Sequence, residues 1–287
     1  MRLIIILLAA GVEYVLDEMN LGHFRDYRRW GWFRSVIQLL EKQGSSIGAW
    51  NGPAGVVATL ALPLLIFWVV YAFIDGAAAF LGILFSVLVL FFCLGPKDIK
   101  AELGSLIQAL GENNPEETAR RAQELVGSSA SIAPQSRGRS VVESALVQAN
   151  DRIFGVVFWF LVLGPLGAVL YRLSSELRAY VGGTESGFAQ SARDFYHILA
   201  WAPARLAALG YAGAGNLMKA IEAWRVKDTL GLDQSEGVLK DSGIGALQLA
   251  DGAAEADQIG AAQGLIYRAV AIWLAAITVL YLIVWMT

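Results

Sequence analysis

The sequence predicts an all-α membrane protein, a polytopic helical bundle with about five or six membrane segments and cytoplasmic amphipathic helices. Of the 287 residues, 56% are hydrophobic and only 16% are charged, whereas about a quarter of the residues in a soluble domain are charged. Several apolar runs approach or exceed the roughly 20 residues that a helix needs to cross a bilayer. The polar segments between these runs show helical rather than strand periodicity.

The first third of the chain predicts three membrane segments and one interfacial helix. Residues 3–16 are almost entirely apolar and form a short first membrane helix in this interpretation. Residues 17–53 are polar, and their stretch RRWGWFRSVIQLLEK predicts a helix in the membrane interface. The runs 54–74 and 77–95 are long and apolar, with only an Asp-Gly link between them. We therefore expect a helical hairpin of two spans.

The polar segment 96–152 predicts soluble helices. Helical periodicity covers 97–110 and 115–125, and residues 128–140 are expected to form a loop. Between the two helices, the stretch ENNPEET has the residues that start a helix, with Asn114 as the cap.

Three further segments of the second half are expected in the membrane. The apolar runs 153–173 and 265–286 predict full spans, although a Gly-Pro pair breaks the middle of the first. The segment 197–216 is expected to span the membrane or to re-enter it, and 217–264 is polar with helical stretches. All segments together are expected to form a single integral membrane domain.

Basic residues predict the topology, because cytoplasmic loops are enriched in them. Residues 17–53 contain five and residues 96–152 contain seven, which places both segments in the cytoplasm and the N-terminus outside. If 217–264 is also cytoplasmic, 197–216 must enter the bilayer. The alternative topology has five full spans and an extracytoplasmic segment 174–264.

The stretch WAPAR predicts a polar site inside the membrane. Arg205 lies within an apolar segment, one turn after Trp201, and an arginine in such a place is costly and often functional. Its guanidinium group suits a carboxylate or a phosphate. Two interpretations stay open: an ion pair between helices, with Glu13, Glu143 or Asp151 as the partner, or a pocket for an anionic ligand.

Other residues complete the set of candidate ligands. Arg172 and Lys97 lie near the ends of apolar segments and could contact a phosphate. Glu143 and Asp151 could hold Mg²⁺ against a phosphate, or they could be solvated charges at helix ends. Pro203 could leave backbone groups unpaired, for a ligand or a neighbouring side chain to satisfy. No GxxxxGK[ST] loop is present, so the residues alone predict no nucleotide site.

Several stretches resemble one superfamily of bacterial inner-membrane proteins. These stretches are LGPKDIKAEL, PEETARRAQELVG, ESALVQANDRIFGVVFW, LGPLGAVLYRL and WAPARLAAL, and their order and spacing resemble the AmpE/CbiB/CobD superfamily. Its CbiB and CobD branches are adenosylcobinamide-phosphate synthases of cobalamin assembly. Its AmpE branch is linked to the regulation of β-lactamase. The resemblance implies a multi-pass protein of the bacterial inner membrane.

Individual positions favour the AmpE branch. The synthases carry a run like ESxAENxxDGxxxPxFW, in which Asp151 matches but the Glu-Asn pair falls on Val147 and Gln148. They also carry an NTLDSM-like segment, whose Asn falls here on Ser175 and whose Asp falls on Arg178. The resemblance therefore implies that polar groups of the synthases are missing from this chain.

Three functions follow as expectations. The first is a regulatory or accessory membrane protein of the AmpE type, linked to β-lactamase induction and peptidoglycan recycling. It would sense a small anionic ligand, such as a muropeptide or a phosphate-bearing molecule. The alternatives are an amide-forming ligase that depends on ATP and Mg²⁺, and a small transporter. The expected partners are the lipid bilayer and either a protein partner or a second copy of the chain, without nucleic acid.

Overall fold

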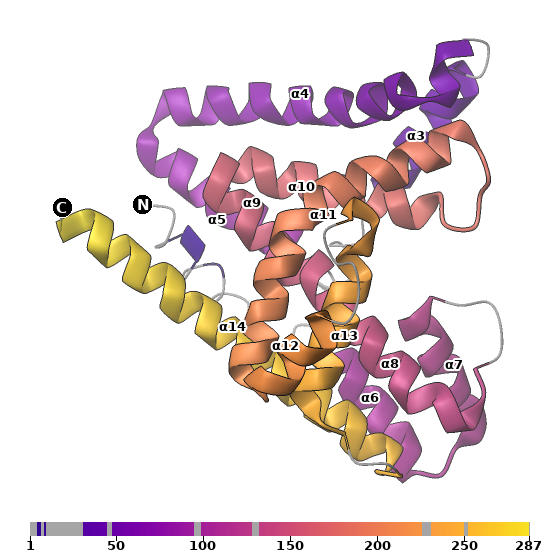
Figure 1. Cartoon of the computed structure of the whole chain (residues 1–287). Helices are drawn as coiled ribbons and strands as arrows, with labels where there is room; N and C mark the ends of the chain where they lie inside the picture. Colours follow the sequence, from indigo (N-terminus) through magenta and orange to yellow (C-terminus); the bar gives the residue numbers. More distant parts are fainter. Residues whose placement is uncertain are drawn as a thin grey trace. The chain divides into compact units, whose positions relative to one another are not determined.

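The computed structural model describes residues 5–6, 9, 31–44, 48–94, 99–127, 132–225, 231–249 and 252–286. These residues form helices joined by short turns and contain no strand, so the predicted all-α fold is confirmed. The elements, labelled as in Figure 1, are α3 (Gly31–Gly44), η1 (Gly48–Asn51), α4 (Pro53–Ala77), α5 (Ala79–Cys93), α6 (Ile99–Gly111), α7 (Pro115–Val126), α8 (Pro134–Ala149), η2 (Asn150–Phe154), α9 (Gly155–Leu163), α10 (Pro165–Tyr180), α11 (Gly187–Ala214), α12 (Leu217–Arg225), η3 (Leu232–Gln234), α13 (Ser235–Leu247) and α14 (Glu255–Met286).

The chain divides into two compact units. Unit 1 comprises Met1–Pro96 and Asp151–Ala200, and unit 2 comprises Lys97–Asn150 and Trp201–Thr287. Each unit is built from two separate stretches of chain, and helix α11 contributes its first part to unit 1 and its second part to unit 2. Hydrophobic periodicity identifies helices but carries no signal for such an exchange of segments.

Unit 1 contains the predicted hairpin of apolar helices. Helix α4 ends where Ala78 adopts an extended conformation, and α5 starts directly after it; Figure 1 shows this sharp turn at the left of the view. Phe67 and Phe85 stack between the two helices, with ring centroids 5.7 Å apart. On the outer face of α4, Phe73 is 80% exposed, as expected for a helix whose surroundings are lipid rather than water.

A second hairpin in unit 1 replaces the single helix predicted over 153–173. Gly164 lies between α9 and α10 with φ 72° and ψ −155°, a backbone conformation open almost only to glycine. Pro165 then starts α10, and a Cβ atom on Gly167 would lie 2.2 Å from the carbonyl oxygen of Trp159. Helices α9 and α10 therefore pack against each other, as Figure 1 shows.

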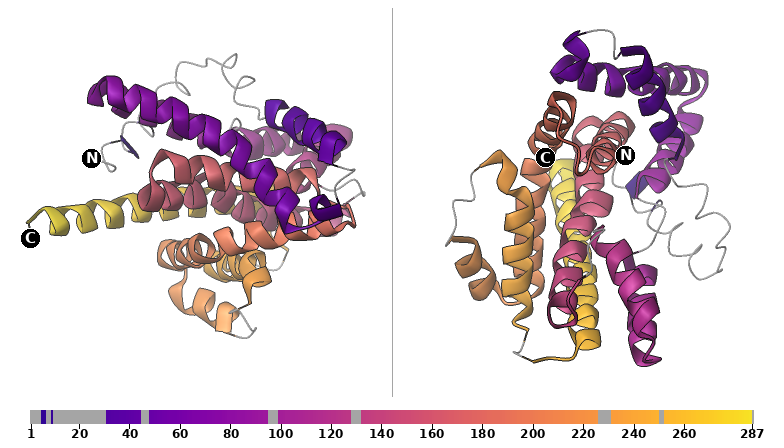
Figure 2. Two further views of the ribbon diagram at one scale, coloured as in Figure 1. Left: turned by 90° about the horizontal axis from the view of Figure 1, so that it is seen from above. Right: turned by 90° about the vertical axis from the view of Figure 1, so that its right-hand side faces the viewer.

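Unit 2 is a group of helices around α8 and α14. Helix α8 contacts α7, α13 and α14, and α14 also contacts α6; the right panel of Figure 2 shows α14, in yellow, beside α8. The predicted cap of α7 is confirmed, because the Asn114 side chain accepts a 3.1 Å hydrogen bond from the backbone N–H of Glu117. The loop predicted over 128–140 is shorter, since α8 already begins at Pro134.

Within the described residues, three helical runs are long and apolar enough to cross a membrane. They are Pro53–Gly76, Pro134–Leu163 and Glu255–Val284, and Phe80–Cys93 is a shorter apolar helix. The run Pro53–Gly76 contains the predicted span 54–74, and Glu255–Val284 contains most of the predicted span 265–286. The second run arises because α8, η2 and α9 follow one another without a break. The predicted segment 3–16 and the first part of 17–53 lie mostly outside the described residues.

Candidate functional site

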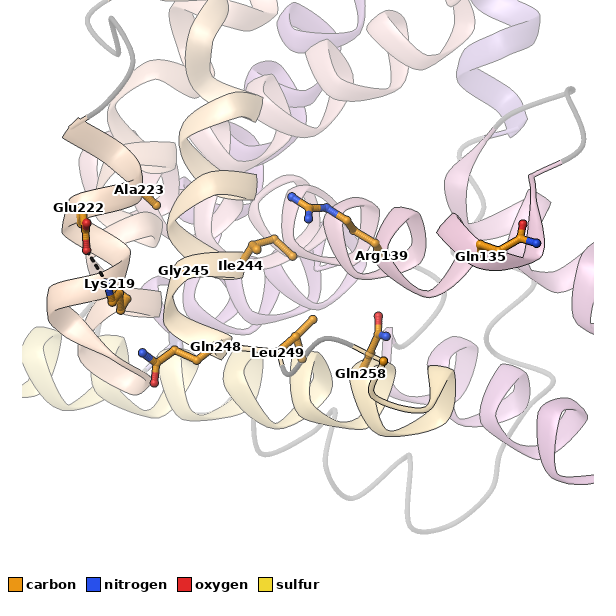
Figure 3. A pocket seen from close by; sticks show the side chains of 11 residues that line it. Gln135, Arg139, Lys219, Glu222, Ala223, Ile244, Gly245, Gln248, Leu249 and Gln258 are labelled. Carbon is orange, nitrogen blue, oxygen red and sulfur yellow. Dashed lines mark hydrogen bonds and ion pairs between the residues drawn. The ribbon is translucent and has the colours of Figure 1, made fainter.

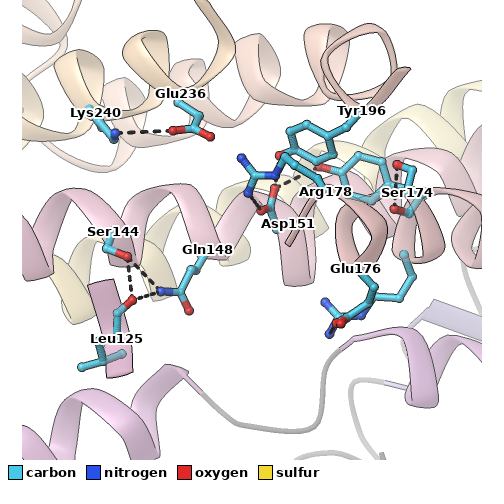
Figure 4. Close-up of polar contacts among 12 residues, drawn as sticks. Leu125, Ser144, Gln148, Asp151, Ser174, Glu176, Arg178, Tyr196, Glu236 and Lys240 are labelled. Carbon is cyan, nitrogen blue, oxygen red and sulfur yellow. Dashed lines mark hydrogen bonds and ion pairs between the residues drawn. The ribbon is translucent and has the colours of Figure 1, made fainter. Parts of the chain in front are cut away.

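A buried polar cluster in unit 1 is centred on Asp151. This carboxylate is only 6% exposed, and its Oδ2 atom accepts a 2.8 Å hydrogen bond from Nη2 of Arg178. Its Oδ1 atom accepts hydrogen bonds from the hydroxyl groups of Tyr196 and Tyr171, the latter over 3.4 Å. Figure 4 shows Asp151 enclosed by Arg178 and Tyr196. We call these four residues the Asp151 cluster.

Local backbone features bring the cluster together. Asp151 belongs to the π-helical turn η2, a wider turn that is frequent at functional sites and changes the direction of side chains. The next helix begins at Gly155, where a Cβ atom would lie 2.2 Å from the ring of Tyr171. The guanidinium group of Arg178 also lies 4.1 Å from the ring centroid of Tyr196, within the range of a cation–π interaction. The cluster thereby joins η2, α10 and α11.

The arrangement of the Asp151 cluster does not fit a magnesium ion. Mg²⁺ is usually bound by carboxylates whose oxygens are available to it, but both oxygens of Asp151 accept hydrogen bonds from the cluster. The other candidate metal ligand, Glu143, pairs with Arg139 over 2.9 Å. Within the described part of the chain, no group of three His, Cys, Asp or Glu residues gathers in a way that could hold a metal.

Arg205 lies in unit 2 against backbone oxygens and an aromatic ring. Its Nη1 donates to the carbonyl oxygen of Trp201 over 2.9 Å, and its Nη2 donates to that of Gly231 over 3.2 Å. The guanidinium carbon lies 4.2 Å from the ring centroid of Trp201. Arg205 and Trp201 thus pack against each other, one turn apart on α11.

Pro203 has the effect on its helix that the sequence predicted. A proline has no N–H group for the carbonyl four residues earlier, which here is Leu199. The indole Nε1 of Trp159 donates a 3.0 Å hydrogen bond to this carbonyl oxygen. A neighbouring side chain, rather than a ligand, therefore satisfies the group that Pro203 leaves open.

The remaining candidates lie apart from one another. Arg172 is buried in unit 1, where its Nη2 contacts Glu176 over 2.6 Å and its Nε has no hydrogen-bond partner among the described residues. Lys97 lies outside the described residues. The structure therefore does not bring the predicted site residues together in one pocket within either unit.

Two positions of the synthase-like motif serve helix packing in unit 2. The hydroxyl group of Ser144 and the amide of Gln148 both donate to the carbonyl oxygen of Leu125, which lies in the last turn of α7 (Figure 4). The last carbonyls of a helix have no partner within it. Gln148, which stands where the synthases have Asn, here fixes α7 against α8.

Sequence reasoning missed Tyr171, Arg178 and Tyr196 as site residues. Arg178 was noted only as a departure from the synthase pattern. Its charge is opposite to the Asp that the pattern has there, and opposite to that of Asp151. This complementarity was the available signal for the pair. The two tyrosines carry no comparable signal, because tyrosine is also common in apolar cores.

Comparison with known proteins defines the class of this chain. The family model described as "CobD/Cbib protein" matches residues 6–231, so the chain belongs to the CobD/Cbib family. The chain is a membrane protein, in keeping with its long apolar helices. No solved structure matches the chain.

Curated relatives narrow this class. The chain is 32% identical over 178 residues to the "Cobalamin biosynthesis protein CobD" of Stutzerimonas stutzeri, which covers 61% of this chain and 59% of that protein. It is 29% identical over 201 residues to the protein of the same name from Chromobacterium violaceum. This match covers 69% of the present chain and 63% of that protein. A third relative of that name, from Dehalococcoides mccartyi, is 29% identical over 216 residues. The matched parts thus span less than two thirds of the first two relatives.

These relatives correct the first functional expectation. The chain was expected to be a regulator of the AmpE type, linked to β-lactamase induction. That expectation is wrong, because the matching family is CobD/Cbib and the three relatives are named for cobalamin biosynthesis. The lost motif residues gave a misleading signal, since a family member can lose individual polar groups and keep its overall pattern.

Proposed function

We propose that this chain acts in cobalamin biosynthesis as a membrane-bound, amide-forming ligase. The observation that carries the proposal is the family match over residues 6–231. The matched range contains the whole Asp151 cluster as well as Arg205. The proposal thus takes up the ligase alternative that the motifs left open.

The proposed reaction joins a carboxyl group of a cobalamin precursor to an amine. A C–N bond forms, and one carboxylate oxygen leaves with the terminal phosphoryl group of a nucleoside triphosphate. The products are the amide, a nucleoside diphosphate and phosphate, with the amine proton passing to solvent. No step is assigned to a metal ion, because the described carboxylates do not fit one.

The residues of the chain have two roles in this proposal. Arg205 provides a guanidinium group, which is the group best suited to bind a carboxylate or a phosphate. It lies on α11, two residues after Pro203, and its guanidinium group packs on the ring of Trp201. The Asp151 cluster holds η2, α10 and α11 in one arrangement and acts as a positioning element. Both carboxylate oxygens of Asp151 already accept hydrogen bonds within the cluster.

A second function is favoured by the same satisfied carboxylate. The chain could bind the cobalamin precursor without forming the amide bond, because the Asp151 carboxylate is not available for catalysis. The chain would then deliver or retain the precursor at the membrane. Binding without product formation distinguishes this function from the first.

A product assay tests both. The purified chain in lipid nanodiscs is mixed with a cobalamin precursor carboxylic acid, an amino-alcohol phosphate, ATP and Mg²⁺, and the amide is sought by mass spectrometry. The ligase predicts a product that requires the chain and that Arg205→Ala reduces strongly. Retention of the precursor on the nanodiscs without product supports the binding function, and the absence of both contradicts the proposal.

We also propose that the chain is a multi-pass protein of the bacterial inner membrane, with the α6–α7 segment in the cytoplasm. The basic residues of this segment support the orientation. A Glu116→Cys substitution in a Cys93→Ala background gives one exposed thiol at the start of α7. We expect an impermeant thiol reagent to label it in inverted vesicles and not in intact spheroplasts; the opposite labelling would reverse the orientation.

A further inference from the structure

Helix α12 has a polar face and an apolar face. Successive residues of a helix lie about 100° apart, so Leu217, Ile221 and Trp224 fall on one side of α12. Lys219 falls on the opposite side, and it bonds Glu222 over 2.8 Å. Both of these charged residues line an open polar cavity of unit 2, as Figure 3 shows. The polar face of α12 therefore borders water, and the apolar face lies on the other side of the helix.

Close packing on α13 fixes the position of α12. Ala220 is buried, and a Cβ atom on Gly245 would lie only 2.6 Å from the carbonyl oxygen of Lys219. The backbone N–H of Asn216, just before α12, donates a 2.9 Å hydrogen bond to the carbonyl oxygen of Ala246. The direction in which the apolar face points is therefore set by the fold of unit 2.

Part of this apolar face remains uncovered in unit 2. Leu217 is 51% exposed, and Met218, at the edge of the face, is 78% exposed. Ile221 and Trp224 are half-buried. A group of exposed apolar side chains beside charged residues is typical of an interaction surface.

Helix α14 shows where the surface of the bilayer lies in unit 2. It is long and apolar enough to cross a membrane, and Arg268 is the last charged residue of the sequence. The uncharged residues 269–286 form a helix about 27 Å long, close to the thickness of a hydrocarbon core of about 30 Å. Tyr267 is exposed and Trp273 lies nearby, as expected for aromatic residues at a water–lipid boundary. Arg268 thus marks this boundary.

Helix α11 leads the chain to the same boundary. The indole Nε1 of Trp273 donates to the carbonyl oxygen of Leu206 over 3.3 Å, and Nε of Arg268 donates to that of Ala214 over 3.0 Å. The end of α11 therefore runs antiparallel to α14 and finishes at the level of Arg268. Helix α12 begins directly afterwards, at Leu217, and Figure 3 shows it running across the direction of α14.

We propose that α12 is an interfacial helix, which inserts Leu217, Ile221 and Trp224 into the bilayer just below the lipid headgroups. Lipid is the partner of this face because the face starts at the level of Arg268, where α14 begins to expose apolar side chains. A tryptophan and leucine on one face with charged residues on the other is the pattern of helices that lie in a membrane surface. The inference rests on α14 crossing the bilayer and not on the proposed ligase reaction.

Quenching of a fluorescent thiol probe by lipid tests the proposal in the full chain. Single cysteines are introduced in a Cys93→Ala background, because Cys93 is the only cysteine of the sequence. Leu217→Cys and Lys219→Cys form a matched pair, since Leu217 is 51% exposed and the side chain of Lys219 is 55% exposed. Each labelled variant is placed in nanodiscs with a phospholipid that carries a nitroxide near its headgroup. Iodide serves as the quencher in water.

The two positions are expected to respond in opposite ways. The nitroxide lipid should remove more fluorescence from the probe at position 217 than from the probe at 219, and iodide should have the reverse order. Equal quenching by lipid at both positions overturns the proposal. A probe at 217 that neither quencher reaches also overturns it, because a protein surface, such as a second copy of the chain, then covers the face.

A reference position tests the depth of α12. Val279 is 54% exposed within the uncharged part of α14, so a probe on Val279→Cys lies deep in the bilayer. A nitroxide near the end of the acyl chain should quench this probe more than the one at 217, and the headgroup nitroxide should do the opposite. Equal depth at the two positions contradicts an interfacial location. If the Tm shows that Leu217→Cys is unfolded, Ile221→Cys repeats the test on the same face, one turn later.

Discussion

Arg178 places its Nη2 atom 2.8 Å from Oδ2 of Asp151 and thereby joins residues that are 27 positions apart in the chain. The resemblance to the synthases implies a second aspartate where Arg178 stands. In this chain a guanidinium group stands there and neutralises the remaining carboxylate. Asp151, which the sequence offered as a possible Mg²⁺ ligand, therefore forms an ion pair with Arg178 instead.

The Asp151–Arg178 pair is expected to stabilise the fold only as a pair. Asp151→Asn leaves a partly buried guanidinium group without its countercharge, which costs about 3–5 kcal/mol of stability. Arg178→Gln has a similar cost, and the double variant recovers part of it. Unfolding of the three variants in a denaturant series measures the coupling. Costs that simply add would show that the two charges do not interact.

The two tyrosines of the cluster are expected to differ in their contribution. Tyr196→Phe removes a close hydrogen bond to a carboxylate and costs about 1.5–3 kcal/mol. Tyr171→Phe costs less, because its hydroxyl lies 3.4 Å from the same oxygen, near the limit of a hydrogen bond. The free energies of unfolding of the two variants check this order. An equal or larger loss for Tyr171→Phe would contradict it.

The α9–α10 hairpin is expected to depend on Gly167. An alanine there would place Cβ 2.2 Å from the carbonyl oxygen of Trp159, and such overpacking costs about 1–3 kcal/mol. Gly104→Ala is the control, because its Cβ would meet no atom within 4 Å; it should gain up to about 1 kcal/mol from helix propensity. If 153–173 formed one straight helix, Gly167→Ala would stabilise the chain as Gly104→Ala does.

Arg205 is expected to affect activity more than folding. Arg205→Ala should abolish product formation while the chain still folds, because its contacts are to two carbonyl oxygens and a partly exposed ring. Hydrogen exchange should rise locally at Gly231, the more distant of these contacts. Normal activity in a well-folded Arg205→Ala variant would remove Arg205 from the site.

Glu117 is expected to make the stability of unit 2 sensitive to acid. Hydrogen bonds from Arg120 and Arg121 lower its pKa from 4.5 to about 2. Because the folded-state pKa is the lower one, this stabilisation is present above pH 4.5 and is lost as the pH falls toward 2. The difference in Tm between the parent chain and Glu117→Gln should shrink over this range. Since the groups are exposed, the effect should be small and weaker at high salt; a constant difference would contradict it.

Local structure was predictable where one residue type determines it. The cap at Asn114 follows from short-range chemistry and occurs in the structure. The turn of the first hairpin was predicted at the Asp-Gly link, but α4 continues through both residues and the chain turns at Ala78. The sequence identified the Gly164-Pro165 pair as a break in the helix, but it did not predict that the chain reverses there into a hairpin. A glycine can bend or fully reverse the chain, and only the backbone angles of Gly164 distinguish the two.

The site was less predictable because its members pair over long distances in sequence. Asp151 and Arg205 were both identified as candidates, but the sequence did not predict the contacts that they make in the structure. Asp151 pairs with Arg178, and Arg205 donates hydrogen bonds to backbone carbonyl oxygens. A sequence shows which charged residues need partners inside a membrane protein, but helix packing decides which partners they find.

Restoration of cobalamin synthesis tests the central claim most directly. The chain is expressed in a bacterium that lacks its own CobD-family protein, and the cobalamin content of the cells is measured by mass spectrometry. The proposed function predicts that the parent chain restores cobalamin and that Arg205→Ala, present in the membrane at the same level, does not. A parent chain that is folded in the membrane but restores no cobalamin would contradict the claim.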